Sequence, residues 1–169
     1  HGYWLKRYGL DGSYTRVPVE PHDVDQFLRG LSAAGFVGCN VTVPHKEAAF
    51  RIAEFKDASA RAIGAANTIW LQGGKLACAN TDSYGFITNL RQQVPAWQPA
   101  RGSALVLGAG GSARAIVHAL LEAGSERVAV ANRALARAQD LAAHFGSRVT
   151  AHGWDDRNRL LADAGIVVN

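Results

Sequence analysis

A glycine-rich turn at residues 108–113 constrains the fold of this chain more than any other feature of its sequence. The turn reads Gly-Ala-Gly-Gly-Ser-Ala, which matches the pattern G-x-G-x-x-G/A. An apolar run at 104–107 precedes it, and residues 112–123 continue with the apolar spacing of a helix. A strand, a tight turn and a helix in this order are typical of a parallel-sheet unit that binds a dinucleotide.

The positions of this turn have separate physical roles. Gly108 permits the tight turn, Gly110 lets backbone N–H groups approach a pyrophosphate, and Ala113 allows close packing of the helix on the strand. The helix N-terminus adds partial positive charge and N–H donors. The alternative is an ordinary strand-to-helix turn without a ligand. We predict a pyrophosphate site formed by Gly108, Ala109, Gly110, Gly111 and Ser112.

The end of the next predicted strand indicates which dinucleotide binds. An NAD site usually has an acidic residue about 20 residues further on, where it binds the ribose 2′-hydroxyl. This chain instead has Asn132 and Arg133, followed one helical turn later by Arg137. An arginine attracts a 2′-phosphate through a charge-assisted donor fork, whereas a carboxylate repels it. We predict NADP (NADPH) as the cofactor; in the alternative, the two arginines are solvated residues at a helix start.

Strand-like and helix-like segments alternate along the chain, which predicts an α/β fold. The predicted strands are 14–19, 36–43, 67–71, 75–80, 104–107, 127–131, 149–151 and 165–168. The predicted helices are 24–31, 44–52, 58–63, 83–93, 112–123 and 134–145. Gly73 and Gly74 indicate a hairpin, and the apolar run 36–43 is typical of a strand buried on both faces of a parallel sheet. The alternation in the second half predicts a parallel sheet there too.

A polar stretch has the composition of a linker and contains Pro95, Trp97, Pro99 and Gly102. We therefore predict two domains. Residues 1–98 form a substrate-binding α/β domain, and residues 99–169 form a Rossmann-type dinucleotide-binding domain. The chain has no methionine and stops within a predicted strand, so we expect both domains to be truncated.

Composition narrows the class of protein. The net charge is +4, but the basic residues are scattered, which argues against nucleic acid and favours a small acidic ligand. No apolar stretch approaches the roughly 18 residues of a membrane span, and the histidines lack the spacing of a helical metal site. Neither membrane nor metal is therefore expected. Cys39 and Cys78 are expected to be buried, reduced thiols in a cytoplasmic protein.

Polar side chains in the first half follow predicted strands at the edge where α/β sheets bind ligands. They are Asn40, Thr42, Lys46, Asn67, Thr68, Asn80, Thr81 and Asp82. One ammonium, one carboxylate and several neutral hydrogen-bonding groups suit a polyhydroxylated ring better than an apolar substrate. Lys46 beside Asp82 would move a proton to or from a hydroxyl. The alternative is a surface lysine and an aspartate that caps a helix.

Five strings along the chain resemble those of the shikimate dehydrogenase family in order and spacing. They are Asn40-Val-Thr-Val-Pro-His-Lys46, Gly64-Ala-Ala-Asn67-Thr, Asn80-Thr-Asp82-Ser-Tyr-Gly85, Gly108-Ala-Gly-Gly-Ser-Ala-Arg114, and Asn132-Arg133 with Arg137. The resemblance implies an NADPH-dependent enzyme that reduces 3-dehydroshikimate to shikimate in aromatic amino acid biosynthesis. It implies a small-molecule substrate and a monomer or homodimer.

The resemblance also implies residue roles. Lys46 is expected to be the catalytic acid/base and Asp82 its partner. Thr42 and Asn67 are expected to bind the substrate, with Asn40 shaping the same pocket. The residues expected to hold the adenosine 2′-phosphate are Asn132, Arg133 and Arg137.

The chain departs from the family pattern at three places. The serine pair that binds the substrate carboxylate would precede His1, the nicotinamide-side segment would follow Asn169, and Ala134 stands where the family usually has threonine. Two alternatives stay open. One is a quinate/shikimate dehydrogenase that uses NAD, and the other is a non-catalytic nucleotide-binding module.

Overall fold

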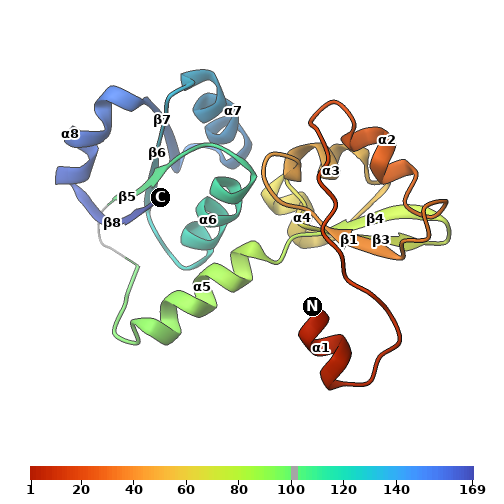
Figure 1. Cartoon of the computed structure of the whole chain (residues 1–169). Helices are drawn as coiled ribbons and strands as arrows, with labels where there is room; N and C mark the ends of the chain where they lie inside the picture. The colour runs from red at the N-terminus through yellow and green to blue at the C-terminus, as the bar shows by residue number, and fades with distance from the viewer. Residues whose placement is uncertain (100–102) are drawn as a thin grey trace.

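Two four-stranded sheets form the centres of two lobes (Figure 1). This computed structural model describes residues 1–99 and 103–169. The strands of the first sheet all precede the strands of the second along the chain. The predicted α/β fold with a sheet in each half is therefore confirmed.

The amino-terminal lobe contains a mixed sheet with the strand order β1-β3-β4-β2. Its strands are β1 (Gly38–Asn40), β2 (Phe55–Lys56), β3 (Thr68–Gln72) and β4 (Lys75–Ala79). Strand β3 pairs antiparallel with β1 and β4, and β4 pairs parallel with β2. Its helices are α1 (Gly2–Arg7), α2 (Val24–Arg29), α3 (Lys46–Ile52) and α4 (Ala58–Ile63). The core of this lobe is built around Leu28, Ala49 and Ile69.

The hairpin between β3 and β4 confirms the local turn prediction. Gly73 and Gly74 have φ angles of 58° and 78°, in the left-handed region that glycine adopts without a steric penalty. Two such residues in succession match the twist of antiparallel strands. The register places Thr68 opposite Ala79, so the start of β3 and the end of β4 lie side by side.

Two strand predictions for this lobe are wrong. Residues 14–19 have no regular secondary structure, because a strand needs a paired neighbour and no strand among the described residues pairs with this segment. The predicted strand 36–43 shrinks to β1, which is antiparallel to β3 and incompletely buried. The apolar pattern arises because residues outside the strand, such as Phe36 just before β1, also pack on the core of the lobe.

The carboxy-terminal lobe contains a parallel sheet with the order β7-β6-β5-β8. Its strands are β5 (Ser103–Leu107), β6 (Arg127–Asn132), β7 (Val149–Gly153) and β8 (Ala164–Val168). Its helices are α6 (Gly111–Glu122), α7 (Leu135–Phe145), the 3-10 helix Trp154–Asp156 and α8 (Arg157–Ala162). The predicted parallel alternation is confirmed. Helix α8 is absent from the sequence prediction because Leu160 alone is buried in it, which leaves no apolar periodicity.

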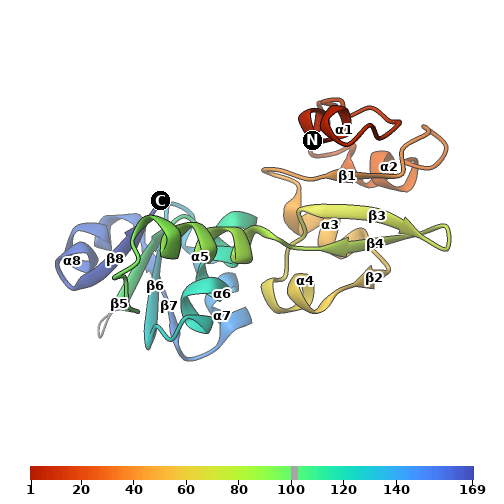
Figure 2. The ribbon, with the colours of Figure 1, turned by 90° about the horizontal axis from the view of Figure 1, so that it is seen from below.

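Helix α5 (Asp82–Gln93) connects the lobes (Figure 2). It begins just after β4 and packs along α6, so its first residue lies where the lobes meet. Trp97, predicted in a polar linker, packs against the core of the carboxy-terminal lobe. Gly102 of that predicted linker lies outside the described residues.

Within residues 1–99 and 103–169, none of the helices has the length and apolarity needed to cross a bilayer. In the same ranges, no three side chains of His, Cys, Asp or Glu gather in a way that would hold a metal ion.

Candidate functional site

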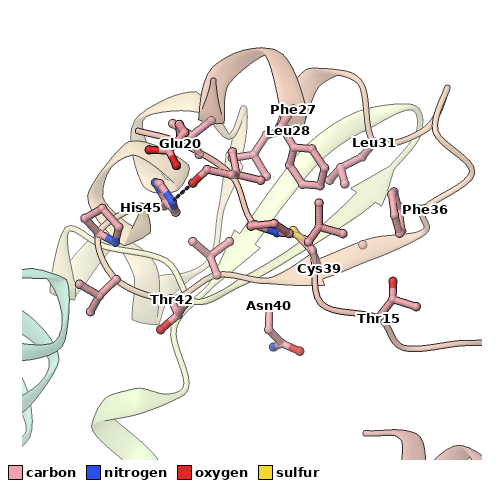
Figure 3. Close-up of a pocket in the computed structure, with 18 of the residues that line it drawn as sticks. Thr15, Glu20, Phe27, Leu28, Leu31, Phe36, Cys39, Asn40, Thr42 and His45 are labelled. Carbon is pink, nitrogen blue, oxygen red and sulfur yellow. Dashed lines mark hydrogen bonds between the residues drawn. The ribbon is translucent and has the colours of Figure 1, made fainter. Parts of the chain in front are cut away.

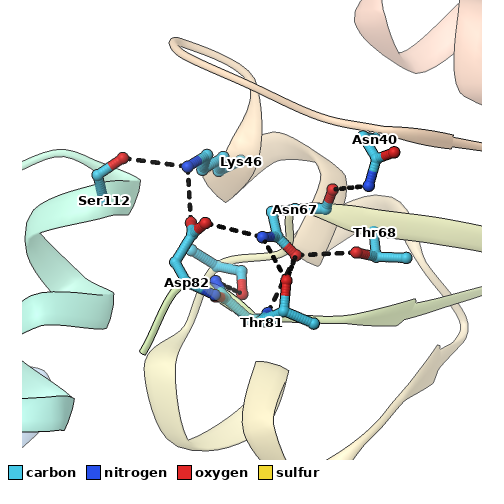
Figure 4. Close-up of polar contacts among 9 residues, drawn as sticks. Asn40, Lys46, Asn67, Thr68, Thr81, Asp82 and Ser112 are labelled. Carbon is cyan, nitrogen blue, oxygen red and sulfur yellow. Dashed lines mark hydrogen bonds and ion pairs between the residues drawn. The ribbon is translucent and has the colours of Figure 1, made fainter. Parts of the chain in front are cut away.

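Lys46 is the first residue of α3 and lies where the two lobes meet (Figure 4). Its side chain is only 11% exposed. Its Nζ donates to Asp82 Oδ2 at 2.6 Å and to Ser112 Oγ at 3.0 Å. Asp82 follows the amino-terminal sheet and Ser112 belongs to the glycine turn of the other lobe. One ammonium group therefore joins the predicted substrate residues to the predicted cofactor residues.

Asp82 is held in place through both its carboxylate and its backbone N–H. Asn67 Nδ2 donates to Asp82 Oδ1 at 2.8 Å, which leaves Oδ2 for Lys46. The Asp82 backbone N–H donates to Asn80 Oδ1, and Asn80 Nδ2 donates to the Ala65 carbonyl, both at 2.9 Å. Asn80 is buried, so its amide sets where α5 begins. An asparagine two residues before a helix start is a usual sequence signal of such a turn, so this role of Asn80 was open to prediction.

The Asn67 side chain is hydrogen-bonded through both ends of its amide. Besides Asp82, its Nδ2 donates to Thr81 Oγ1 at 3.0 Å. Its Oδ1 accepts from Thr68 Oγ1 at 2.9 Å and from the Thr81 backbone N–H at 3.1 Å. Asn40 joins this cluster at its edge, because its Nδ2 donates to the Asn67 carbonyl at 3.5 Å. Lys46, Asp82 and Asn67 thus form one network, with Asn40 attached at its edge.

A hollow of about 560 Å³ lies beside this network in the amino-terminal lobe (Figure 3). Its floor is apolar and includes Phe27 and Leu31, whereas Asn40 and Thr42 line it as polar residues. No side-chain hydrogen bond among the described residues joins Thr42 to the Lys46 network. The structure therefore places Thr42 on the wall of the hollow, apart from the predicted catalytic pair.

Cys39 also lines this hollow, which corrects the expectation that both thiols are buried. Cys78 is buried, but Cys39 is only partly so, and both are free. Burial nonetheless raises the pKa of the Cys39 thiol to about 11. The pKa of Cys78 is also raised, mainly by burial.

A second cavity of about 260 Å³ lies between the lobes, where the glycine turn faces α3. Gly108, Gly110, Gly111 and Ser112 line it, and they are four of the five residues that the sequence predicts to bind a pyrophosphate. Ala109 does not line it and is buried in the core of its own lobe. A Cβ on Gly111 would stand 2.7 Å from Lys46 Cβ, so only glycine permits this approach of the turn to α3.

The residues predicted for the 2′-phosphate are not gathered at one point. Asn132 Nδ2 donates to the Ala134 carbonyl at 2.8 Å, and Arg133 is exposed. Arg137 extends to the other lobe, where its Nη2 donates to Glu47 Oε1 at 2.8 Å. Arg133 and Asn132 lie together at the end of β6, whereas Arg137 pairs with Glu47 on the wall of the cavity that the glycine turn also lines.

Comparison with known proteins identifies the family. The model of the shikimate dehydrogenase substrate binding domain matches residues 1–69, and the model of shikimate / quinate 5-dehydrogenase matches residues 91–169. Over all 169 residues the chain is 57% identical to a shikimate dehydrogenase (NADP(+)) of Brucella ovis. The chain belongs to the shikimate dehydrogenase family. It spans 58% of the length of the Brucella ovis relative.

Solved structures of two proteins share the fold of this shikimate dehydrogenase family chain. Shikimate 5-dehydrogenase of Thermus thermophilus, in complex with NADP(H) and shikimate, is 41% identical with a TM-score of 0.71. The match covers 86% of this chain and 54% of that one. The ligand-free 5-ketofructose reductase of a Gluconobacter strain is 34% identical with a TM-score of 0.65, covering 88% of this chain and 53% of that one.

The structure also reveals a residue that sequence reasoning missed in this family member. Glu47, next to Lys46 on α3, meets two arginines of the other lobe, Arg114 and Arg137. No local pattern in the sequence predicts this contact, because Arg114 and Arg137 follow Glu47 by 67 and 90 residues and meet it only through the packing of the lobes.

Proposed function

We propose that this protein catalyses the NADP-dependent reduction of 3-dehydroshikimate to shikimate. The observation that carries the proposal is the position of Lys46, whose ammonium contacts both Asp82 and the Ser112 hydroxyl of the glycine turn. A proton donor at that position lies between a polar substrate site and a dinucleotide site. The names of the Brucella ovis relative and the Thermus thermophilus complex support the same reaction.

The proposed chemistry is the conversion of a ring ketone to a secondary alcohol. When bound, NADPH supplies the hydride that reaches the carbonyl carbon. Lys46 donates a proton from Nζ to the carbonyl oxygen, and its positive charge stabilises the negative charge that develops there. Asp82 keeps the ammonium in place through the 2.6 Å contact and compensates its charge in a largely buried position.

The proposed substrate site lies where the Lys46 network meets the hollow. Both ends of the Asn67 amide are engaged, so a ring hydroxyl would bind Asn67 by replacing one of these hydrogen bonds, such as the contact with Thr81 Oγ1. Asn40 and Thr42 supply further polar groups on the wall of the hollow. A ring with several hydroxyls would satisfy these groups, whereas an apolar ligand would leave them unpaired.

Features of the glycine turn support dinucleotide binding at the cavity between the lobes. Gly108 has a φ of 115°, a conformation that favours glycine. A Cβ on Gly110 would project into open space, so the backbone there is free to approach a pyrophosphate. Among the described residues no side chain caps the N-terminus of α6, whose first N–H groups lack intrahelical partners. Arg133 and Arg137 favour NADP over NAD, because both carry a charge that a 2′-phosphate attracts.

The decisive experiment is a spectrophotometric assay of the full-length protein with shikimate. We expect NADP⁺ to be reduced in a shikimate-dependent manner and NAD⁺ to be reduced much more slowly. Faster turnover of quinate with NAD⁺ would favour the quinate/shikimate dehydrogenase alternative. Dinucleotide binding without turnover of either acid would favour a non-catalytic nucleotide-binding module.

A further inference from the structure

Glu47 connects the lobes through two ion pairs that differ in distance and in the exposure of the arginine. Its Oε1 lies 2.8 Å from Arg137 Nη2, and its Oε2 lies 3.9 Å from Arg114 Nε. The Arg137 side chain is 55% exposed, whereas that of Arg114 is 13% exposed. One arginine is therefore free to reorient toward solvent, and the other is confined between the lobes.

If the cofactor is NADP, Arg137 has two possible anionic partners, the Glu47 carboxylate and the 2′-phosphate. It lies in the first turn of α7, the helix that follows the end of β6 at Asn132. From there a change of side-chain rotamer turns its guanidinium from Glu47 toward the strand end, where the 2′-phosphate is proposed to bind. The Nη2 bond to Glu47 holds the guanidinium against the other lobe, so it cannot lie at the strand end at the same time. The two anions therefore compete for Arg137.

We propose that Glu47 is a specificity-determining residue, which competes with the cofactor's 2′-phosphate for Arg137. NADP breaks the Glu47–Arg137 pair when it binds, whereas NAD, which has no 2′-phosphate, leaves the pair intact. Glu47 thus lowers the affinity for the phosphorylated cofactor and reduces the preference for NADP that the arginines create. This inference rests on the proposed use of NADP.

Arg114 makes the exchange feasible. A carboxylate left without a partner in a half-buried position would be costly. Glu47 is 28% exposed, and the buried Nε of Arg114 has no hydrogen-bond partner among the described residues. When Arg137 leaves, Glu47 Oε2 is free to approach this unused donor. On its other side the Arg114 guanidinium lies close to Gly64, where an added Cβ would stand only 3.1 Å from Nη1.

The test compares two nucleotides that differ in the 2′-phosphate alone. Isothermal titration calorimetry on the full-length protein gives dissociation constants for adenosine 2′,5′-bisphosphate and for 5′-AMP. Glu47→Gln keeps the shape of the side chain and removes its charge. We expect Glu47→Gln to lower the dissociation constant for the bisphosphate by about 1.5-fold to fivefold, which corresponds to the energy of a partly exposed ion pair. The dissociation constant for 5′-AMP should not change.

Two controls separate competition from general electrostatics. Asp25→Asn removes one carboxylate from an exposed ion pair with Arg29 and should affect neither nucleotide. In an Arg137→Ala background, Glu47→Gln should no longer change the bisphosphate affinity, because the contested guanidinium is absent.

Several results would overturn the inference. Weaker bisphosphate binding by Glu47→Gln would mean that Glu47 positions Arg137 for the phosphate. Equal tightening of both nucleotides, or tightening that persists in the Arg137→Ala background, would mean that the charge of Glu47 acts without competition. If the wild-type protein binds the bisphosphate no better than 5′-AMP, the proposed NADP preference itself fails and this inference fails with it.

Discussion

The Lys46 ammonium lies 2.6 Å from the Asp82 carboxylate across 36 residues of sequence. Each residue begins a helix, Lys46 in α3 and Asp82 in α5, and both helices start where the lobes meet. The β3–β4 hairpin lies between them and brings Asn67 within hydrogen-bonding distance of Asp82. The geometry of this pair therefore depends on backbone elements as much as on the two side chains.

Asn80→Ala should destabilise the protein and disturb the proposed catalytic pair, Lys46 and Asp82. The variant removes both the acceptor for the Asp82 N–H and the donor to the Ala65 carbonyl, in a buried position. Leaving buried groups unpaired costs about 1–3 kcal/mol each. Denaturant unfolding should show a loss in this range, and kcat should fall at temperatures where the variant is folded. Unchanged stability together with unchanged kcat would contradict the role of Asn80.

Gly111→Ala should impair turnover through a steric effect. The added Cβ would meet Lys46 Cβ at 2.7 Å, so the glycine turn and α3 must separate. A displacement of reacting groups by about 1 Å can lower the rate by about 100-fold. We therefore expect kcat to fall by about 10-fold to 100-fold.

Gly85→Ala is a matched control for this substitution. Gly85 lies within α5, and a Cβ there would meet no atom within 4 Å. Alanine is the better helix former by about 1 kcal/mol, so this variant should be slightly more stable and equally active. Equal kcat values for the two alanine variants would show that the approach of Gly111 to Lys46 has no catalytic importance.

Arg133→Ala should weaken the binding of NADP⁺ and leave the binding of NAD⁺ unchanged. Arg133 is exposed and directly follows β6, so its guanidinium is accessible to a ligand. A hydrogen bond to a charged group contributes about 1.5–3 kcal/mol, so the KM for NADP⁺ should rise by about tenfold or more. Steady-state kinetics with both cofactors measures the ratio. An unchanged ratio would remove Arg133 from the cofactor site.

Cys39 should react slowly with iodoacetamide at neutral pH. Burial raises the pKa of its thiol from 9.0 to about 11, and the thiolate is the reactive form. Alkylation at Cys39, followed by peptide mass spectrometry, should therefore accelerate as the pH approaches 11. Rapid alkylation at neutral pH would contradict the burial of this thiol.

The same thiol should make stability depend on alkaline pH. Between pH 9.0 and about 11 the folded chain retains a proton at Cys39 that the unfolded chain has lost. The free energy of unfolding should therefore fall as the pH rises through this window, and the fall should be smaller in Cys39→Ala. Denaturant unfolding of both proteins across the window measures the difference.

Local signals in the sequence predict most of this fold. The Gly73-Gly74 turn and the strand–turn–helix unit around Gly108 are specified by neighbouring residues, and both form as expected. Residues 14–19 have a similar strand-like pattern, but no strand within the described residues pairs with them. A pattern predicts a strand only when the fold also supplies a partner.

The proximity of Lys46 and Asp82 was also predictable from the sequence. Lys46 and Asp82 each follow a strand, so the topology of the sheet brings them to one edge. Arg137 also follows a strand, but its guanidinium pairs with Glu47 of the other lobe. That contact depends on how the lobes pack, which no short segment of sequence encodes.

The most direct test of the account is the kcat of Lys46→Ala in the full-length protein, with Lys75→Ala as an exposed lysine control on the β3–β4 hairpin. Loss of a positioned proton donor should lower kcat for shikimate oxidation by about 10²–10⁴-fold, with a much smaller change in KM. Lys75→Ala should match the wild-type protein. A Lys46→Ala variant that folds normally and retains the wild-type kcat would contradict the assignment of Lys46 as the proton donor.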